Sequence, residues 1–260
     1  MTRIPLEVLT GWADAQLRTA EVPDYPPALN GLQLANASGA VSRIAAAVDG
    51  SRRAIEGAIS VGADLLVLHH GLFWGGNQRI VGAYHERLSL LMRHGIAVYA
   101  SHLPLDLHPT LGNNARLAAL LGLAPSGGFG RFQQTFVGCQ GSSDVPTAAL
   151  VQRAEPLATR YGGRVHHTPI TAERRTRRWA IITGAGASSE SLRDAAAQGI
   201  DTLITGEGPH HTAVEAPELG LVVIYAGHYA TETFGVAALA EAMGSEFGLP
   251  WSFIEAPTGT

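Results

Sequence analysis

Short apolar runs alternate with amphipathic stretches along most of this chain. The run Leu65 to Leu68 has the length and composition of a buried strand, and Ser51 to Val61, just before it, has the pattern of a helix that ends at Gly62. Strands that alternate with helices are typical of a largely parallel sheet with helices on its faces. The pattern therefore predicts an α/β fold.

The same pattern predicts helices and strands in two stretches of the chain. In the first, we expect helices over 5–17, 51–61, 85–94 and 114–121, and strands over 43–48, 65–68 and 96–100. In the second, we expect strands over 179–183, 202–205, 222–226 and 251–254, and helices over 189–198, 212–219 and 236–247.

Residues 124–178, between these stretches, have a different pattern. Glycine-rich turns over 126–130, a short strand over 132–137 and a helix over 146–161 indicate an antiparallel or irregular addition. This part ends in a basic run formed by Arg174, Arg175, Arg177 and Arg178. We interpret the run as a solvated turn between strands, and contact with an anionic ligand is the alternative.

One pattern occurs twice in the sequence. Gly95 to Asp106 reads GIAVYASHLPLD, and Gly220 to Glu232 reads GLVVIYAGHYATE. Each copy has an apolar run, then Tyr-Ala, a small residue, a histidine, and a carboxylate four residues after that histidine. An internal repeat without the period of a repeat protein indicates two similar α/β units. We expect a first unit over 1–125, a second over 126–260, and a site built between them.

Imidazoles and carboxylates follow the predicted strands at four places. They are His69 with His70, His102 with Asp106, Glu207 with His210 and His211, and His228 with Glu232. Open parallel sheets bind ligands at the carboxyl ends of their strands, so this placement indicates a functional site. Imidazole and carboxylate without thiolate form the ligand set of hydrolytic Zn, Mn, Fe, Co or Ni sites. Five or six such groups suit two ions bridged by a carboxylate and a water.

Composition narrows the class of protein further. The chain has 260 residues, of which 46% are hydrophobic and 15% charged, as in a compact globular protein. A net charge of −4 provides no basic stripe, so nucleic-acid binding is not expected. The single cysteine excludes an intrachain disulfide and suits a reducing compartment. Because the N-terminal segment has no long apolar stretch, we expect a cytoplasmic protein without a signal peptide or membrane span.

Two other chemistries have weaker support. No serine or cysteine lies in a nucleophile-elbow motif. The segment Ile182 to Leu192, ITGAGASSESL, is only loosely similar to a phosphate-binding loop, because it has neither the P-loop lysine nor the full GxGxxG spacing. We interpret it as a strand-to-helix turn, with nucleotide binding as the alternative.

Five segments together resemble the dinuclear-metal-centre hexameric protein family, also called GTP cyclohydrolase 1 type 2 homologue or Nif-three-like. They are NGLQL (Asn30 to Leu34), HHGLFW (His69 to Trp74), HLPLDLHPTLGNNARLAALLG (His102 to Gly122), ITGEGPHHT (Ile204 to Thr212) and AGHYATETFGV (Ala226 to Val236). The resemblance runs from about residue 5 to 257. The chain has no room for the extra central domain of some members, so it resembles the short bacterial form.

The resemblance implies two similar, intertwined α/β/α units with mainly parallel sheets, a toroidal hexamer, and two divalent ions per subunit. The implied metal ligands are His69, His70, Asp106, His228 and Glu232. His102 is similar to a family histidine beside the site, which suggests a catalytic role as a proton carrier or a partner of the ligands. The identity of the metal stays open, because mixed nitrogen and oxygen ligands accept several ions.

Two functions fit this interpretation. The first is a metal-dependent hydrolase acting on a small, nucleotide-like or cyclic-amide substrate. The second is a non-catalytic protein that stores, delivers or senses divalent ions. Because no pocket motif identifies a base or a sugar, the sequence does not specify the substrate.

Overall fold

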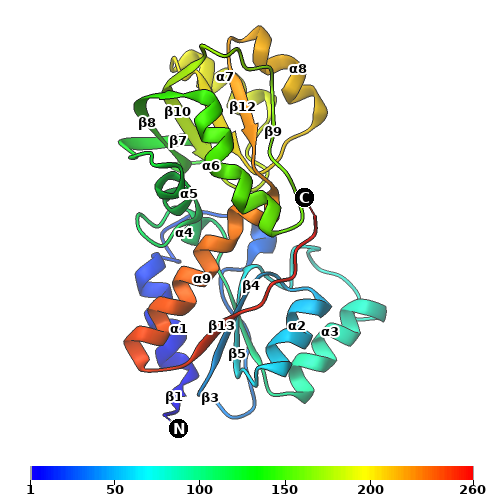
Figure 1. Ribbon diagram of the computed structural model, residues 1–260. Helices are drawn as coiled ribbons and strands as arrows, with labels where there is room; N and C mark the ends of the chain where they lie inside the picture. The colour runs from blue at the N-terminus through cyan, green and yellow to red at the C-terminus, as the bar shows by residue number, and fades with distance from the viewer. Residues whose placement is uncertain (1, 260) are drawn as a thin grey trace. The chain divides into compact units, whose positions relative to one another are not determined.

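The computed structural model describes residues 2–259, which form two compact units (Figure 1). Unit 1 comprises the chain up to Leu105 together with Gly235–Ala256, and unit 2 comprises Asp106–Phe234 and the residues from Pro257 on. Each unit is therefore assembled from two separate segments. These bounds differ from the simple division at residue 125 expected from the sequence.

Unit 1 contains a five-stranded sheet with a parallel centre. The strand order is β13–β4–β5–β6–β2, in which β2 alone runs antiparallel to its neighbour. The strands are β2 (Gly31–Leu34), β4 (Ile44–Asp49), β5 (Leu65–His70), β6 (Ala97–Ala100) and β13 (Trp251–Phe253). A separate antiparallel pair joins β1 (Ile4–Pro5) to β3 (Ala40–Val41).

Helices cover both faces of this sheet, as the alternation of side chains along β6 shows. On one face Val98 belongs to the core cluster formed with helices α2 (Arg52–Ser60) and α3 (Gly82–Arg93). On the other face the hydroxyl of Tyr99 donates to Asp14 on α1 (Leu6–Leu17), at 2.9 Å. Successive strand residues point to opposite faces, so both faces of β6 are buried. This explains the uninterrupted apolar runs of the central strands.

Unit 2 contains a six-stranded sheet in the order β7–β8–β10–β11–β12–β9. Its three central strands are parallel, and β7, β8 and β9 are antiparallel. The strands are β7 (Gly127–Phe132), β8 (Thr135–Pro146), β9 (His166–His167), β10 (Arg175–Ile182), β11 (Thr202–Thr205) and β12 (Val222–Tyr225). The fold is thus mixed α/β, with a parallel centre in each main sheet and antiparallel strands at the edges.

Helices also pack on both faces of the sheet in unit 2. One core cluster joins Ile181 of β10 to α5 (Asn113–Leu121) and α6 (Thr147–Arg160). A second joins Ala180, its neighbour, to α7 (Ser189–Ala197) and α8 (His210–Glu218). The packing of α5 in this core explains why unit 2 begins before residue 126. The remaining helices are η1 (Pro26–Ala28), α4 (Leu103–Asp106) and α9 (His228–Phe247).

Two expectations about the middle of the chain were wrong. The glycine-rich residues 127–130 form most of strand β7 rather than turns, and β7 and β8 make a hairpin. The basic run is not a turn either, because β10 begins at Arg175. Arg175 pairs with Asp144 on β8 at 2.5 Å, and Arg174 donates to the carbonyl oxygens of Asp201 and Gly220 at 2.9 Å. The guanidinium groups of these two arginines thus connect neighbouring segments of unit 2.

The last helix also begins earlier than expected, at His228 rather than Val236. Its first two turns carry polar residues, His228, Thr231 and Glu232, that interrupt the apolar spacing on which the expectation rested. These side chains are needed inside the protein, since Thr231 and Glu232 are buried. Among residues 2–259, no helix combines the length and the hydropathy that a membrane crossing requires.

Candidate metal centre

Three histidines of unit 1 meet at the carboxyl edge of its sheet. His69 and His70 are the last residues of β5, and His102 follows the adjacent parallel strand β6 after one intervening serine. Because the two strands are in register, with Leu68 opposite Ala100, their ends lie side by side. One ring nitrogen from each histidine lies within 4.8 Å of the others, so the group can hold a metal ion.

Each of these imidazoles uses Nδ1 for a hydrogen bond within unit 1. The acceptors are the Ser101 carbonyl oxygen for His69 (3.0 Å), Asp49 Oδ1 for His70 (2.8 Å) and Asp24 Oδ1 for His102 (2.9 Å). When Nδ1 donates its hydrogen in this way, the neutral ring keeps its lone pair on Nε2. This arrangement is typical of metal-binding histidines, because it fixes both the tautomer and the orientation of the ring.

Asp24 lies in the loop after α1 and is one of two carboxylates that sequence reasoning missed. Besides His102, it accepts the side-chain amide of Asn30 at 2.8 Å and the backbone N–H of Leu103 at 2.9 Å. Burial raises the pKa of Asp24, but the hydrogen bonds and the charge of His102 outweigh it, so the pKa falls below its usual value. Asp24 therefore remains a carboxylate. Its proline-rich loop offered no sequence signal.

Asp49 is the other missed carboxylate, and here a signal existed. It is the last residue of β4, directly after the apolar run Ile44 to Val48, and it lies opposite His70 in the parallel register. The rule that placed the histidines at the carboxyl edge applies equally to this aspartate. It was missed because no metal-ligand motif contains it.

Two aromatic rings stand beside the histidines of unit 1. The ring of Trp74 lies 4.8 Å from that of His102 and 5.5 Å from that of His70, both nearly perpendicular. The ring of Tyr25 lies 6.1 Å from His102 and 6.4 Å from Trp74. The loop that leads to Trp74 is held by Gln33, whose side-chain oxygen accepts the N–H of Leu72 at 2.7 Å. Gln33 belongs to the NGLQL segment, so this segment helps to shape the site.

In unit 2, His228 lies between two carboxylates. Its Nε2 is 3.1 Å from Oε2 of Glu232, one helical turn along α9, and its Nδ1 is 2.8 Å from Oε1 of Glu207. Burial lowers the pKa of His228, but the hydrogen bonds and charges of Glu232 and Glu207 outweigh it and raise the pKa to about 9. The two carboxylates thus favour a positive charge here, which a divalent cation can supply in place of the proton. The donor set therefore fits a metal ion.

Gly184 provides the space that Glu232 occupies. A Cβ atom at residue 184 would lie 2.1 Å from Oε1 of Glu232 and 3.3 Å from Nε2 of His228, and the backbone there has φ of +65°. Further along the same segment, Ser188 and Ser191 form a capping box at the start of α7. The segment is a strand-to-helix turn, as interpreted from the sequence, and its first glycine makes room for a candidate metal ligand.

Asp106 lies at the end of α4 and is buried. Its Oδ1 accepts a hydrogen bond from the side-chain amide of Asn113 at 2.7 Å. Its backbone carbonyl oxygen accepts one from the side-chain amide of Asn114 at 3.1 Å. Asn114 in turn accepts the N–H of Thr183 at 3.0 Å, next to Gly184. Hydrogen bonds therefore connect Asp106 with the segment that borders Glu232 in unit 2.

The structure thus places the expected site residues in two groups. Unit 1 brings together His69, His70 and His102, and unit 2 brings His228 and Glu232 together. Glu207, whose role the sequence left open, joins the second group through His228. His210 and His211 lie in the exposed first turn of α8.

The fold and this donor set define a mixed α/β protein with a histidine group that can hold a metal ion. The chain belongs to the Duf34/NIF3 (NGG1p interacting factor 3) family, whose model matches residues 17–258.

Similar proteins cover nearly the whole chain. A "GTP cyclohydrolase 1 type 2 homolog" of Halobacterium salinarum is 42% identical over 249 residues, which are 92% of this chain and 94% of that protein. One of the same name from Deinococcus radiodurans is 39% identical over 251 residues, 96% of this chain and 93% of that protein. The solved structure of protein ybgI, described as of unknown function, matches with a TM-score of 0.87 and 34% identity, covering 99% of this chain and 100% of that chain.

The close approach at Gly184 leads to a prediction about stability. Gly184→Ala adds a Cβ atom against Glu232 at a positive φ, whereas Gly220→Ala, at φ +73° in the same unit, adds one where no atom lies within 4 Å. We expect Gly220→Ala to cost about 1 kcal/mol for its backbone conformation alone. Gly184→Ala should cost about 1–3 kcal/mol more, because the added atom is overpacked. Urea unfolding of both variants measures the difference, and equal midpoints would contradict the crowding at Glu232.

Proposed function

We propose that this protein is a metal-dependent hydrolase with a dinuclear divalent-metal centre. In this proposal the ligands are His69, His70, Asp106, His228 and Glu232, contributed by both units. The observation that carries it is the hydrogen bonding of the histidines. Nδ1 of His69 and of His70 bonds to a carbonyl or carboxylate oxygen, which keeps the lone pair of each neutral ring on Nε2. Nδ1 of His228 bonds to Glu207, and a cation bound at Nε2 would replace the proton that His228 shares with Glu232. Such orientation before binding lowers the entropy cost of holding a metal.

The residues around the ligands have distinct roles in the proposed reaction. Divalent ions held here lower the pKa of water and neutralise negative charge that develops on the substrate. His102, whose Nδ1 bonds to the buried carboxylate of Asp24, holds and transfers a proton. The rings of Trp74 and Tyr25 lie beside His102 and provide aromatic surface next to its imidazole. Glu232 contributes a buried negative charge that reduces the repulsion between two neighbouring cations.

A cavity next to the candidate ligands favours hydrolysis over simple metal handling. Glu207 bonds to His228 and also lines a cavity of about 520 Å³ within unit 2, which is large enough for a small-molecule substrate. Storage or delivery of an ion requires no such space. The name shared by the relatives from Deinococcus radiodurans and Halobacterium salinarum supports a substrate with a nucleotide-like or cyclic-amide ring.

Metal analysis followed by an activity screen tests the proposal. The purified protein is analysed for its metals, and the metal found is supplied in a hydrolysis screen of nucleotides and cyclic amides. The proposal predicts two ions per chain and a turnover that is lost on chelation and restored by the metal. Two ions that transfer readily to an acceptor protein, without turnover of any screened compound, would instead support metal storage or delivery.

The first prediction from the proposed function concerns Glu232. Glu232→Gln keeps the size of the side chain but removes its charge, so at least one of the two ions should be lost together with hydrolytic activity, while the fold persists. Glu241→Gln, an exposed position on the same helix, is the matched control and should keep both ions. Metal content and melting temperature are measured for both variants. Two tightly bound ions in Glu232→Gln would show that this charge does not hold the pair.

The second prediction separates proton transfer from metal binding at His102. If His102 carries a proton, His102→Gln keeps two ions per chain and lowers turnover by about a hundredfold or more. The same variant should also lose one arm of the pH–rate profile, which a purely structural change would leave in place. Loss of an ion from His102→Gln would make His102 a ligand instead.

The third prediction concerns assembly. We propose that six copies form a ring, as the family resemblance implies. Apolar side chains near the start of the chain support an interface, since Tyr25, Leu29 and Leu32 are 48%, 54% and 42% exposed. Light scattering at micromolar concentration should give six times the mass of 27.3 kDa. A stable monomer would contradict this proposal.

A further inference from the structure

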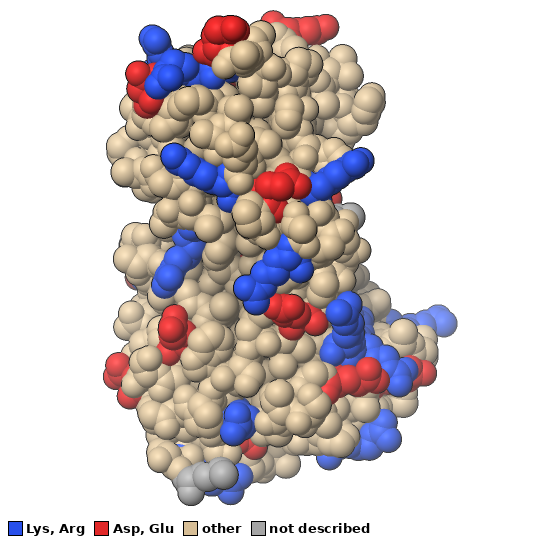
Figure 2. Space-filling model, in the orientation of Figure 1, with Lys and Arg blue, Asp and Glu red and all other residues tan. Residues whose placement is uncertain are grey.

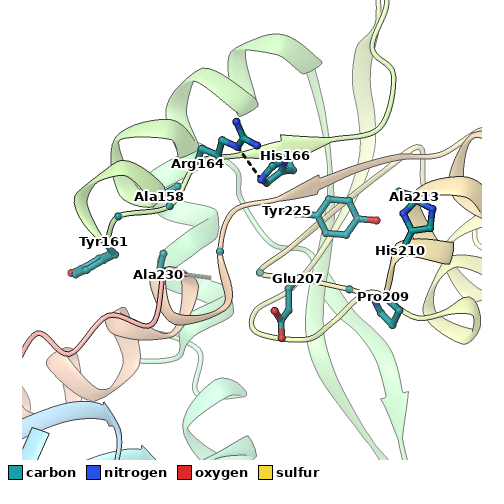
Figure 3. Close-up of a pocket in the computed structure, with 16 residues that line it drawn as sticks. Ala158, Tyr161, Arg164, His166, Glu207, Pro209, His210, Ala213, Tyr225 and Ala230 are labelled. Atoms are coloured by element: carbon teal, nitrogen blue, oxygen red, sulfur yellow. Dashed lines mark hydrogen bonds between the residues drawn. The ribbon is translucent and has the colours of Figure 1, made fainter. Parts of the chain in front are cut away.

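The cavity of about 520 Å³ lies entirely within unit 2 (Figure 3). It is lined by the end of α6, the segment that leads to β9, the loop between β11 and α8, and the end of β12. Six glycines border it, which leaves backbone in place of side chains on its walls: Gly162, Gly163, Gly206, Gly208, Gly227 and Gly259. Its volume falls within the range of small-molecule sites, about 300–1,000 Å³.

One side of the cavity is basic. Arg164 and His166 lie next to each other, with Nε of Arg164 donating to Nε2 of His166 at 3.2 Å. Figure 3 shows this pair on one side of Tyr225 and His210 on the other. That hydrogen bond uses only Nε, so it leaves the terminal Nη groups of the guanidinium as the donors for a planar anion such as a carboxylate or phosphate.

The first turn of α8 adds to the positive potential. The helix begins at His210, its N-cap residue is Pro209, and no side chain caps this turn. The backbone N–H groups at the start of a helix together favour a negative charge placed beside them. Arg164, His166 and the start of α8 therefore surround one cavity with donors suited to an anion.

The remaining wall is aromatic and apolar. Tyr225 lines the cavity, and its hydroxyl bonds to Oγ1 of Thr212 at 2.8 Å, which fixes the ring. Tyr161 and the methyl groups of Ala158, Ala213 and Ala230 complete the wall. A fixed aromatic ring presents a face on which a planar ligand can stack.

Glu207 connects this cavity to the candidate metal ligands. Its carboxylate is bonded to Nδ1 of His228, and Figure 3 shows the Glu207 side chain below Tyr225, with the carboxylate pointing away from Arg164 and His166. Glu207 has the only carboxylate among the described residues that line the cavity. Because this carboxylate bonds to His228, its negative charge is already balanced and does not oppose the binding of an anion.

We propose that this cavity binds an aromatic anion, with a planar ring against Tyr225 and a phosphate or carboxylate group at Arg164 and His166, within the positive potential to which the start of α8 contributes. The assignment of this ligand as the substrate rests on the proposed hydrolase function. In that case the bond to be cleaved would lie at the end of the ligand next to Glu207, which bonds to the proposed metal ligand His228. Binding of the anion itself does not depend on hydrolysis.

Calorimetry with phenyl phosphate tests the proposal. The titration uses the full chain, both as purified and after the removal of metals by chelation, with folding verified by melting curves. Inorganic phosphate lacks the ring, phenol lacks the charge, and benzoate replaces phosphate with carboxylate. We expect phenyl phosphate to bind the metal-free protein about tenfold more tightly than either inorganic phosphate or phenol. Binding of benzoate at a similar affinity would identify a carboxylate site, and much weaker binding would identify a phosphate site.

Variants locate the bound anion. Arg164→Gln should weaken phenyl phosphate binding about tenfold. Arg177→Gln removes the charge of another exposed arginine, on β10 and outside the cavity lining, and should leave the affinity unchanged. Tyr225→Leu should weaken binding while Tyr225→Phe, which keeps the ring, should not.

Three results would overturn this inference. One is equal affinity in Arg164→Gln and Arg177→Gln, and another is phenyl phosphate binding no tighter than inorganic phosphate. The third is binding that requires the metal, which would place the anion on the ions rather than in the cavity. If phenyl phosphate binds as expected but no compound is hydrolysed, the cavity is confirmed and the hydrolase function fails.

Discussion

The hydrogen bond at Nδ1 of each site histidine is the interaction on which this account depends. An imidazole in a protein can present either nitrogen, and only a fixed acceptor decides which one carries the lone pair. His69, His102 and His228 satisfy this requirement with three different acceptors, which are a backbone oxygen, an aspartate and a glutamate. The acceptors come from loops and strand ends far apart in the sequence. The fold is therefore needed to orient these imidazoles, because their partners come together only in the folded chain.

The two units meet this requirement in different ways. In unit 1, the site histidines lie at the ends of neighbouring parallel strands, so the sheet register sets the distance between His69 and His102. In unit 2, His228 and Glu232 lie one turn apart on a helix, and a residue without a side chain, Gly184, lets the carboxylate approach. The two copies of the sequence repeat thus both end in a histidine and a carboxylate, but these residues lie in different local structures. A wall of glycines next to Glu207 then leaves space for a ligand in unit 2.

The sequence predicted much of the fold and part of the site, for physical reasons that particular residues illustrate. Strong apolar runs such as Leu65 to Leu68 defined the parallel strands, because both faces of these strands are buried. The start of α9 was missed because its buried residues include Thr231 and Glu232, whose polarity suggests a loop. Asp24 could not be found at all, since its pairing with His102 joins residues 78 positions apart.

The most direct test of the central claim is a crystal structure of the metal-loaded protein with anomalous scattering measured at the absorption edge of its metal. The account predicts two peaks, bound by Nε2 of the histidines and by carboxylate oxygens at roughly 2.0–2.3 Å. The proposed ligands are His69, His70, Asp106, His228 and Glu232. A single ion, coordination through Nδ1, or ions bound away from these side chains would contradict it.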